Sequence, residues 1–432
     1  MDDIAKLSAR QIAAKVAARE LSAEAVVRAC LERIAAAEPQ VHAWQHLDAA
    51  SALAGARDID RGTLQGALLG VPLGVKDLMD TADMPTTYGS PIYAGHRPSV
   101  DAACVAGCRE AGAVILGKTV STEFATFQPG PTRNPRAPVE RPHTPGGSSS
   151  GSAAAVAAGM VPLAFGTQTA GSIVRPAAYC GVVGYKPTHG LLPLAGIKPL
   201  SPSLDTVGVL ARSVDDAVFF IGVLARCDLQ AKLPAGLRVG LCHTPHWERA
   251  SGDARRAFAE AGRLFGGAGA SVQDVQEPGS WTGLTQAQID IMGYEALAAF
   301  APERGTSAVQ FSAAFAAFLE GALAVDGGRF ADAQRLAEQA RAELATLFRT
   351  VDVLVAPSAE GEAPEGLDAT GNPIFNRMWT LLGVPCVHVP LGVGTTGLPV
   401  GVTVIGPRWG DALALAAAAQ LERGARAAGM GG

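Results

Sequence analysis

The sequence predicts an α/β protein in which strands and helices alternate along the chain and pack in layers. Short apolar segments bounded by glycine recur between longer segments with helical spacing, which is the pattern of layered α/β folds. The chain has 432 residues, 48% of them hydrophobic, which is enough to bury a large core. We find no internal repeat and no long linker, so we expect one domain over residues 1–432.

Four segments are expected within this domain. An N-terminal helical segment covers residues 1–65, and a core covers 66–225. A variable, mostly helical region covers 226–350, and strands and a helix at 351–432 complete the core.

The first segment is predicted to form a pair of helices. Ser8 and Gln11 have the spacing of a capping box, in which each side chain accepts a hydrogen bond from the other residue's backbone N–H. Ser22 is placed to cap a second helix through Val26, Cys30 and Ile34.

The core segment begins with glycine-broken apolar residues at 66–75, which resemble a buried strand. Residues 100–112 have a helical pattern, and 113–117 form a short strand. Proline and arginine at 126–145 predict an irregular loop. A helix of small residues at 153–159 and a strand beginning at 161 follow.

The alternation continues after residue 225. We expect strands at 237–242, 271–275 and 351–355, and helices over most of 284–350. Residues 385–393 and 398–405 are predicted to form a hairpin joined by Gly-Thr-Thr-Gly. Asp411 is expected to cap a final helix rich in alanine and leucine.

Composition excludes several classes of protein. The net charge is −5 without a basic stripe, which argues against a nucleic-acid partner. The first residues lack a signal-peptide pattern, and no apolar run approaches the ~18 residues that cross a bilayer. Seven scattered cysteines favour free thiols in a reducing cytoplasm. Cys104 and Cys108 have helical spacing, but no second pair or histidine completes a zinc site, so we expect no metal.

The stretch Gly147-Ser-Ser-Ser-Gly151 allows three interpretations. A flexible linker fits its composition, but both flanks are apolar structural segments. A phosphate loop would need a lysine at its end, and none follows before Lys186. A nucleophile elbow with Ser149 at its centre would need a preceding strand, but three prolines occupy residues 138–145.

A second glycine–serine stretch has a better context for an exposed serine. The residues Gly166-Thr-Gln-Thr-Ala-Gly-Ser172 follow the strand that begins at Val161, and Pro176 stands near a helix start. Successive N–H groups in such a turn can bind an oxyanion beside a nucleophile. An ordinary serine at a strand-to-helix turn is the alternative.

Together the two stretches closely resemble the amidase signature family. The resemblance is carried by Gly146 to Thr188, by Gly70-Val-Pro-Leu-Gly-Val-Lys76-Asp, by residues 111–124 and by residues 397–406. It covers most of the chain and is weakest from about 228 to 350. It implies the amidase signature fold, an α/β fold with a large mixed central β-sheet covered on both sides by helices.

By resemblance, Ser172 is the nucleophile, Ser148 the bridging serine and Lys76 the base, and the peptide bond Gly147–Ser148 is cis. The chemistry is consistent, because a buried lysine has a lowered pKa and can accept a proton when neutral. The N–H groups of Thr169, Ala170, Gly171 and Ser172 would bind the oxyanion. The product is an acyl-enzyme on Ser172 that water hydrolyses, with release of ammonia or an amine. No cofactor or metal is required. Lys118 and Lys186 are structural in the family.

This chain departs from the family at Gln168 and Ala170, where many members have Asp and Gly. Arg175 stands three residues after the nucleophile, as in malonamidase-type enzymes, where that arginine binds a substrate carboxylate. A structural role for Arg175 is the alternative. Arg133, Gln128 and Tyr88 are further candidates for the substrate cleft.

The resemblance therefore implies an amidase that hydrolyses a small amide bearing a carboxylate. One alternative is a glutaminase-type subunit of a tRNA-dependent amidotransferase complex, and another is an allophanate- or carboxybiuret-type hydrolase. The expected partner is a small-molecule amide, without nucleic acid or membrane. The N-terminal helices could cover the core or pair two chains in a homodimer.

Overall fold

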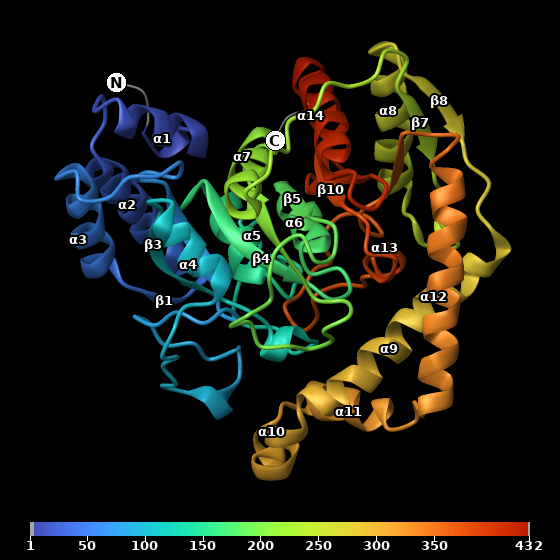
Figure 1. The fold of residues 1–432 in the computed structure, drawn as a ribbon, viewed down its shortest axis with the longest axis horizontal. Helices are drawn as coiled ribbons and strands as arrows, with labels where there is room; N and C mark the ends of the chain where they lie inside the picture. The colour runs from blue at the N-terminus through green and yellow to red at the C-terminus, as the bar shows by residue number, and fades with distance from the viewer. Residues whose placement is uncertain (1–3, 431–432) are drawn as a thin grey trace.

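The computed structural model describes residues 4–430, and within them a single 11-stranded sheet crosses the molecule (Figure 1). The strand order is β1-β3-β2-β4-β6-β5-β10-β11-β9-β7-β8. The strands are β1 (Trp44–Leu47), β2 (Pro72–Lys76), β3 (Val114–Thr119), β4 (Leu163–Gln168), β5 (Val183–Lys186), β6 (Thr206–Ala211), β7 (Arg238–Leu241), β8 (Ser271–Asp274), β9 (Val353–Pro357), β10 (Cys386–Val393) and β11 (Pro399–Ile405).

The sheet is mixed. Strand β2 pairs in parallel with β3 and β4, and β7 pairs in parallel with β8 and β9. The other pairs are antiparallel, including the predicted hairpin of β10 and β11. An α/β fold with a large mixed sheet is confirmed.

Helices surround the sheet and also extend beyond it. They are α1 (Ala9–Ala17), α2 (Ala23–Val41), α3 (Ala49–Asp60), α4 (Ala103–Glu110), α5 (Ser150–Ala157), α6 (Val174–Cys180), α7 (Val214–Ala225), α8 (Gly252–Gly267), α9 (Leu284–Ala299), α10 (Ala301–Thr306), α11 (Ala313–Ala322), α12 (Gly327–Leu347), α13 (Arg377–Leu382) and α14 (Asp411–Ala427). Helices α9 to α12 stand at one side of the molecule, apart from the central layers (Figure 1).

Both faces of the sheet are covered. On β4, the ring of Phe165 packs against Phe220 of α7 with centroids 5.0 Å apart. A side chain on the next residue, Gly166, would instead meet Ser149 and Ile173, which begin α5 and α6. Because successive strand residues point to opposite faces, α7 lies on one side and α5 with α6 on the other.

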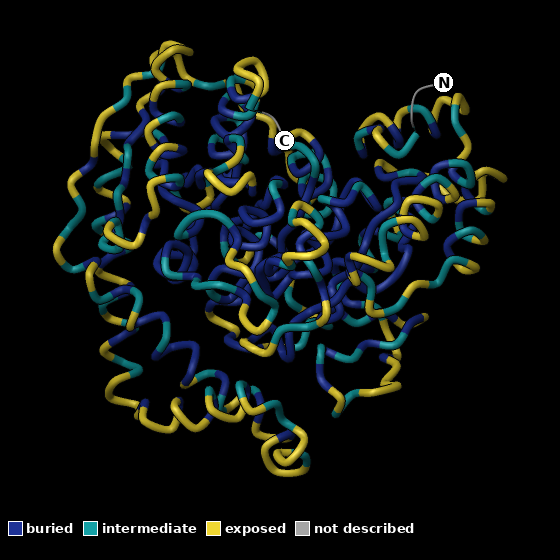
Figure 2. Tube along the Cα trace, turned by 180° about the vertical axis from the view of Figure 1, so that it is seen from behind, coloured by how far each residue is buried: buried dark blue, intermediate teal, exposed yellow. Residues whose placement is uncertain are grey.

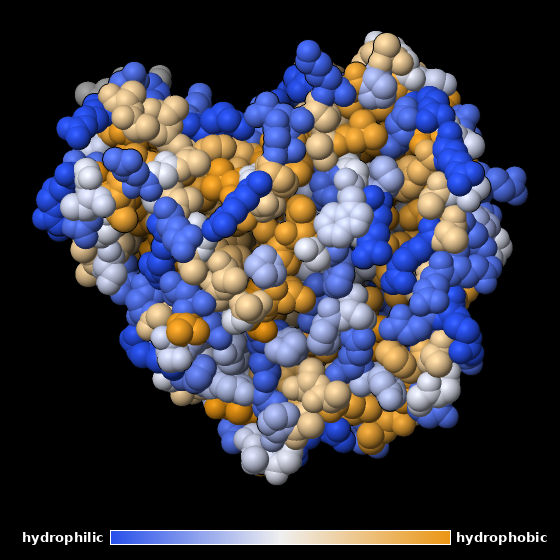
Figure 3. Space-filling model, viewed as in Figure 1, coloured by the Kyte–Doolittle hydropathy of each residue, from blue (hydrophilic) through white to orange (hydrophobic). Residues whose placement is uncertain are grey.

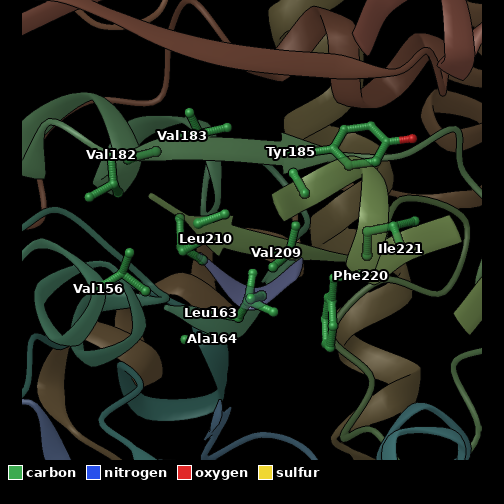
Figure 4. Close-up of a cluster of buried hydrophobic side chains, with 14 of the residues drawn as sticks. Val156, Leu163, Ala164, Val182, Val183, Tyr185, Val209, Leu210, Phe220 and Ile221 are labelled. Atoms are coloured by element: carbon green, nitrogen blue, oxygen red, sulfur yellow. The ribbon is translucent and has the colours of Figure 1, made fainter. Parts of the chain in front are cut away.

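The core lies between these layers. Figure 4 shows part of it, with Val156 of α5, Leu163 of β4, Tyr185 of β5, Val209 of β6 and Phe220 of α7. Buried residues fill the centre, and exposed ones lie mainly on the outer helices (Figure 2). On the face seen in Figure 3, hydrophilic residues prevail at the rim, and hydrophobic ones are more frequent toward the middle. Among the described residues, no helix combines the length and apolar character needed to cross a membrane.

Local predictions hold at the N-terminus and fail at two other places. The Ser8–Gln11 capping box and the Ser22 cap are both present. Within the strand predicted at 66–75, only the residues from Pro72 onward form a strand, which is β2. The chain turns before it, because Gly66 and Gly70 adopt φ of 151° and 72°.

The expected capping role of Asp411 is wrong. Asp411 is the first residue of α14, and Gly410 occupies the cap position. The Asp411 carboxylate accepts hydrogen bonds from Tyr185 Oη at 2.7 Å and from Thr188 N at 2.8 Å. It therefore ties the start of α14 to the end of β5.

Candidate active site

Lys76 lies at the end of β2 and is fully buried, with 0% of its surface exposed. Its Nζ is 2.7 Å from Ser148 Oγ and 2.7 Å from Thr167 Oγ1 on the neighbouring strand β4. Burial holds the pKa of Lys76 well below its usual range, and the charge of the Asp205 carboxylate has a smaller effect in the opposite direction. This environment favours the neutral amine, which can accept a proton.

Ser148 lies in the loop before α5, and the Gly147–Ser148 peptide bond is cis, as the resemblance implies. Arg175 Nη2 donates to Gly147 O at 2.7 Å. The hydroxyl of the adjacent Ser149 points elsewhere, to Thr167 O at 3.3 Å. The loop thus presents Ser148, and not Ser149, to the lysine.

The loop of residues 169–172 offers hydrogen-bond donors to a ligand. Its carbonyls are engaged by the protein, since Thr169 O accepts from Gln288 Nε2 at 2.9 Å and Ala170 O accepts from Thr380 Oγ1 at 2.8 Å. Its four N–H groups donate to no acceptor among the described residues. Ala170 does not adopt a positive φ, so alanine fits where many relatives have glycine. Free N–H groups in such a turn suit an oxyanion.

Ser172 ends this loop and is 6% exposed. Its hydroxyl makes no hydrogen bond with any described residue, so it remains available to a substrate. A direct Ser148–Ser172 hydrogen bond is not formed between these two described residues. Hydrogen bonds of a catalytic relay often tighten only when substrate binds.

Gln168 explains one departure from the family pattern. Its Oε1 accepts hydrogen bonds from Ile173 N at 2.9 Å and Val174 N at 3.0 Å, where helix α6 begins. Its Nε2 donates to Thr380 Oγ1 at 2.9 Å. The glutamine therefore fixes both ends of the 169–172 loop.

Asp205 stands directly before β6, opposite this loop, because Gln168 pairs with Thr206 in the sheet. Its carboxylate accepts from Thr169 Oγ1 at 2.5 Å, Leu200 N at 2.9 Å and Ser201 N at 3.0 Å. Burial raises the pKa of Asp205 to about 6, although these hydrogen bonds oppose the shift. Asp205 therefore positions the loop and contributes to the electrostatic field at Lys76.

Arg175 is buried and bonded entirely to the protein itself. Besides Gly147 O, its guanidinium donates to Gly371 O at 2.5 Å and Thr370 Oγ1 at 3.1 Å. Its Nε is buried without a partner among the described residues. These bonds support the structural alternative for Arg175, with two backbone carbonyls and one hydroxyl as its acceptors.

Three other candidates make no hydrogen bond to Ser172 within the described residues. Arg133 lines a separate pocket of about 270 Å³ with Arg33 and Arg136. Gln128 is exposed. The Tyr88 hydroxyl donates to Asp80 Oδ1 at 2.7 Å within an aromatic cluster.

The other two lysines of the core have different partners. Lys118 Nζ is 3.0 Å from Asp77 Oδ1, and Lys186 Nζ donates to Pro187 O at 2.8 Å. Neither has a hydrogen bond to Ser148 or Ser172 in the part of the chain described.

Sequence reasoning missed Thr167, Asp205, Gln288, Arg377 and Thr380. Arg377 Nη1 donates to Gln288 Oε1, and Asn376 lies against Gly171, where an added Cβ would sit 2.5 Å from its Oδ1. Thr167 lies five residues before Ser172 on β4 and could have been found from strand alternation. The others reach the site from α9, α13 and the start of β6, and no local pattern marks them.

A buried lysine in contact with a serine, beside a second serine on a donor-rich loop, is typical of a serine hydrolase with a lysine base. The Amidase family model matches residues 25–415. The chain therefore belongs to the amidase family, whose members hydrolyse amide C–N bonds, and it is an amidohydrolase.

Known proteins resemble it over nearly their whole length. A glutamyl-tRNA(Gln) amidotransferase subunit from Acidothermus cellulolyticus is 35% identical, covering 95% of this chain and 93% of that protein. The peptide amidase of Stenotrophomonas maltophilia is 30% identical, with a TM-score of 0.81 and coverage of 98% and 97%. A protein of a vestigial complex that reveals the evolutionary origins of an s-triazine catabolic enzyme is 29% identical, with a TM-score of 0.86 and coverage of 96% and 98%.

Proposed function

We propose that the protein hydrolyses a small carboxylic amide through an acyl-enzyme on Ser172. The observation that carries the proposal is the contact between buried Lys76 and Ser148 at 2.7 Å, next to a loop whose N–H groups are free of partners among the described residues. Neutral Lys76 takes the proton of Ser148, and Ser148 takes that of Ser172 as Ser172 Oγ attacks the amide carbon.

The remaining steps use the same groups. The N–H groups of residues 169–172 stabilise the oxyanion, and the C–N bond breaks as Lys76 returns the proton to the leaving nitrogen through Ser148. Water then attacks the ester on Ser172, with the same relay as its base, and releases the acid. Ammonia or an amine is the second product.

The seven cysteines are all free thiols, which supports a reducing cytoplasm as the location.

The test measures ammonia release from a panel of small amides with native protein and variants. We expect Ser172→Ala and Lys76→Met each to lower kcat by at least about 10³-fold, because each removes part of one chemical unit. Mass spectrometry should detect acylation of Ser172 in the native protein and in Ser149→Ala, since the Ser149 hydroxyl bonds only to the backbone of Thr167. Acylation of Ser149, or no release from any amide, would refute the proposal.

A second candidate is a glutaminase that acts within an amidotransferase complex. It is favoured by relatives such as the amidotransferase subunit of Acidothermus cellulolyticus, at 35% identity. The two functions predict different activities for the isolated chain, because a glutaminase of this kind should hydrolyse glutamine only with its partners. Purified chain that hydrolyses simple acidic amides but not glutamine would favour the first proposal. Size-exclusion chromatography of the native protein would distinguish monomer, homodimer and heteromeric complex.

A further inference from the structure

Two buried guanidinium groups lie close together beside the candidate active site without a carboxylate. Arg175 is 5% exposed and Arg377 is 8% exposed. No ion pair joins either of them to any described acidic residue. Burial and the neighbouring positive charge of Arg175 lower the pKa of Arg377 to about 10.

Buried charges are normally paired, since removing an ion from water is costly unless an opposite charge compensates it. The described part of the chain supplies no such charge here. An anion that entered with the substrate would complete the pairing, so the arrangement is typical of a site for a ligand carboxylate.

The two arginines differ in how much of the guanidinium is already used. Arg175 donates to Gly147 O, Gly371 O and Thr370 Oγ1, and so holds the loop that carries Ser148. Arg377 has a single hydrogen bond within the described residues, to Gln288 Oε1. Most N–H donors of Arg377 therefore remain free, whereas Arg175 already uses several of its N–H donors.

Arg377 is also placed at the reacting end of the site. It begins helix α13, and this helix packs on the 169–172 loop through Thr380 Oγ1, which donates to Ala170 O at 2.8 Å. Gln288 joins Arg377 to Thr169 O. Arg175 follows Ser172 by three residues and lies in the first turn of α6.

We propose that Arg377, with Arg175 beside it, binds the carboxylate of a short monoamide of a dicarboxylic acid, because both arginines are tied to the loops that carry Ser148 and Ser172. This inference rests on the proposed amidase function. Arg377 is thus the specificity-determining residue, and Arg175 mainly holds the Ser148 loop.

The same charges discriminate against an α-amino group. No carboxylate of a described residue influences the pKa of Arg175 or Arg377, so an ammonium beside the substrate carboxylate would meet two positive charges without a partner. Glutaramate, which is glutamine without its amino group, should therefore be a better substrate than glutamine.

Kinetics with matched substrates test the inference. Arg377→Ala should raise KM for malonamate by about 10²-fold, as expected when a buried charge pair is lost, and should lower kcat/KM for propionamide at least about tenfold less than for malonamate. Arg377→Lys should give an intermediate KM, because it keeps the charge and loses the fork. Arg175→Ala should lower kcat for both substrates.

Arg341 provides the matched control. Its Nη2 donates to Leu381 O on the same helix α13, but it does not contact the 169–172 loop. Arg341→Ala should leave both substrates unaffected. Equal losses on malonamate and propionamide in Arg377→Ala would overturn the inference, as would glutamine being preferred to glutaramate.

A binding measurement separates this inference from the amidase proposal. Malonate should raise the Tm of Ser172→Ala, and this rise should vanish when Arg377→Ala is added. The amidase proposal fails if native protein neither releases ammonia nor is acylated at Ser172. The carboxylate site fails if the malonate-induced rise in Tm persists without Arg377, whatever the activity.

Discussion

At the scale of single residues, the site combines a buried lysine, which forms no ion pair with a described residue, with one carboxylate, that of Asp205, whose charge acts on it. Within residues 4–430, the hydrogen-bond partners of Lys76 Nζ are two hydroxyl groups, Ser148 Oγ and Thr167 Oγ1. Hydroxyls can donate to a neutral amine or accept from an ammonium, so these contacts do not force the protonated form. Burial therefore decides the charge, and Asp205 adjusts it.

Asp205→Asn should move the acid limb of the pH profile of kcat/KM to lower pH. The Asp205 carboxylate raises the pKa of Lys76, so removing its charge lowers that pKa further and keeps Lys76 neutral in more acidic solution. Ammonia release by native and variant protein, measured across pH, gives the comparison.

Asp216→Asn is the control, because Asp216 is also buried but has no influence on the pKa of Lys76. Its acid limb should coincide with that of the native protein. A limb that moves to higher pH in Asp205→Asn would contradict this assignment of Asp205.

The part of the site that sequence could predict is the part that lies in continuous motifs. Lys76, Ser148 and Ser172 stand in glycine-rich segments that can be recognised in the sequence by their residue types and spacing. Arg377 and Gln288 could not be predicted, because a helix at 377–382 and another at 284–299 reach the loop only after the chain folds. The sequence also predicts an arginine, Arg175, near the nucleophile. It could not predict the hydrogen bonds of Arg175 to residues 370 and 371.

At the scale of elements, helix α13 forms the wall of the 169–172 loop. A Cβ on Gly171 would lie 2.5 Å from Asn376 Oδ1 and 2.9 Å from Pro373 Cβ. The absence of a side chain at Gly171 thus permits the close approach of the segment before α13 to the loop.

Gly171→Ala should lower kcat/KM by about 10- to 10³-fold, because the added methyl group displaces N–H donors that stabilise the oxyanion. Overpacking should also cost about 1–3 kcal/mol of stability. Kinetics and urea unfolding measure the two effects.

Gly55→Ala is the matched substitution outside the site. Gly55 lies inside helix α3, and no described atom outside the backbone of that helix is within 4 Å of an added Cβ. It should raise the free energy of unfolding by about 0.5–1 kcal/mol and leave activity unchanged. Unchanged activity in Gly171→Ala would show that α13 does not hold the loop.

The ends of helices could be predicted from the sequence where the side chain of a single residue determines them. Ser8 and Ser22 cap their helices because hydroxyls accept from nearby N–H groups. Asp411 has the same capacity, yet Tyr185 and Thr188 take its oxygens, and these residues are more than 200 positions away. Tertiary partners therefore overrode the local preference.

At the scale of the whole molecule, one sheet collects strands from all four expected segments. Strand β1 belongs to the first segment, β2 to β6 to the second, β7 and β8 to the third, and β9 to β11 to the last. This continuity supports our proposal of a single domain over residues 1–432. It also brings Lys76 and Ser172 together, because Lys76 ends β2, Ser172 lies in the loop after β4, and these two parallel strands are neighbours in the sheet.

Burying Lys76 should lower the stability of the whole molecule at neutral pH. In the unfolded chain its pKa is about 10.4, and in the folded protein it is well below that value. Between these two pKa values the unfolded state binds one more proton, so the free energy of unfolding rises with pH by up to about 1.4 kcal/mol per unit.

Comparison with Lys76→Met isolates this contribution, because methionine has no proton to release. The free energy of unfolding of native protein minus that of Lys76→Met should increase from about pH 7 to about pH 9.5 and level off above the unfolded pKa of about 10.4. Urea unfolding followed by circular dichroism at each pH gives both values. A difference that stays constant or falls with rising pH would mean that Lys76 remains protonated in the folded protein, and a protonated lysine could not act as the base for Ser172.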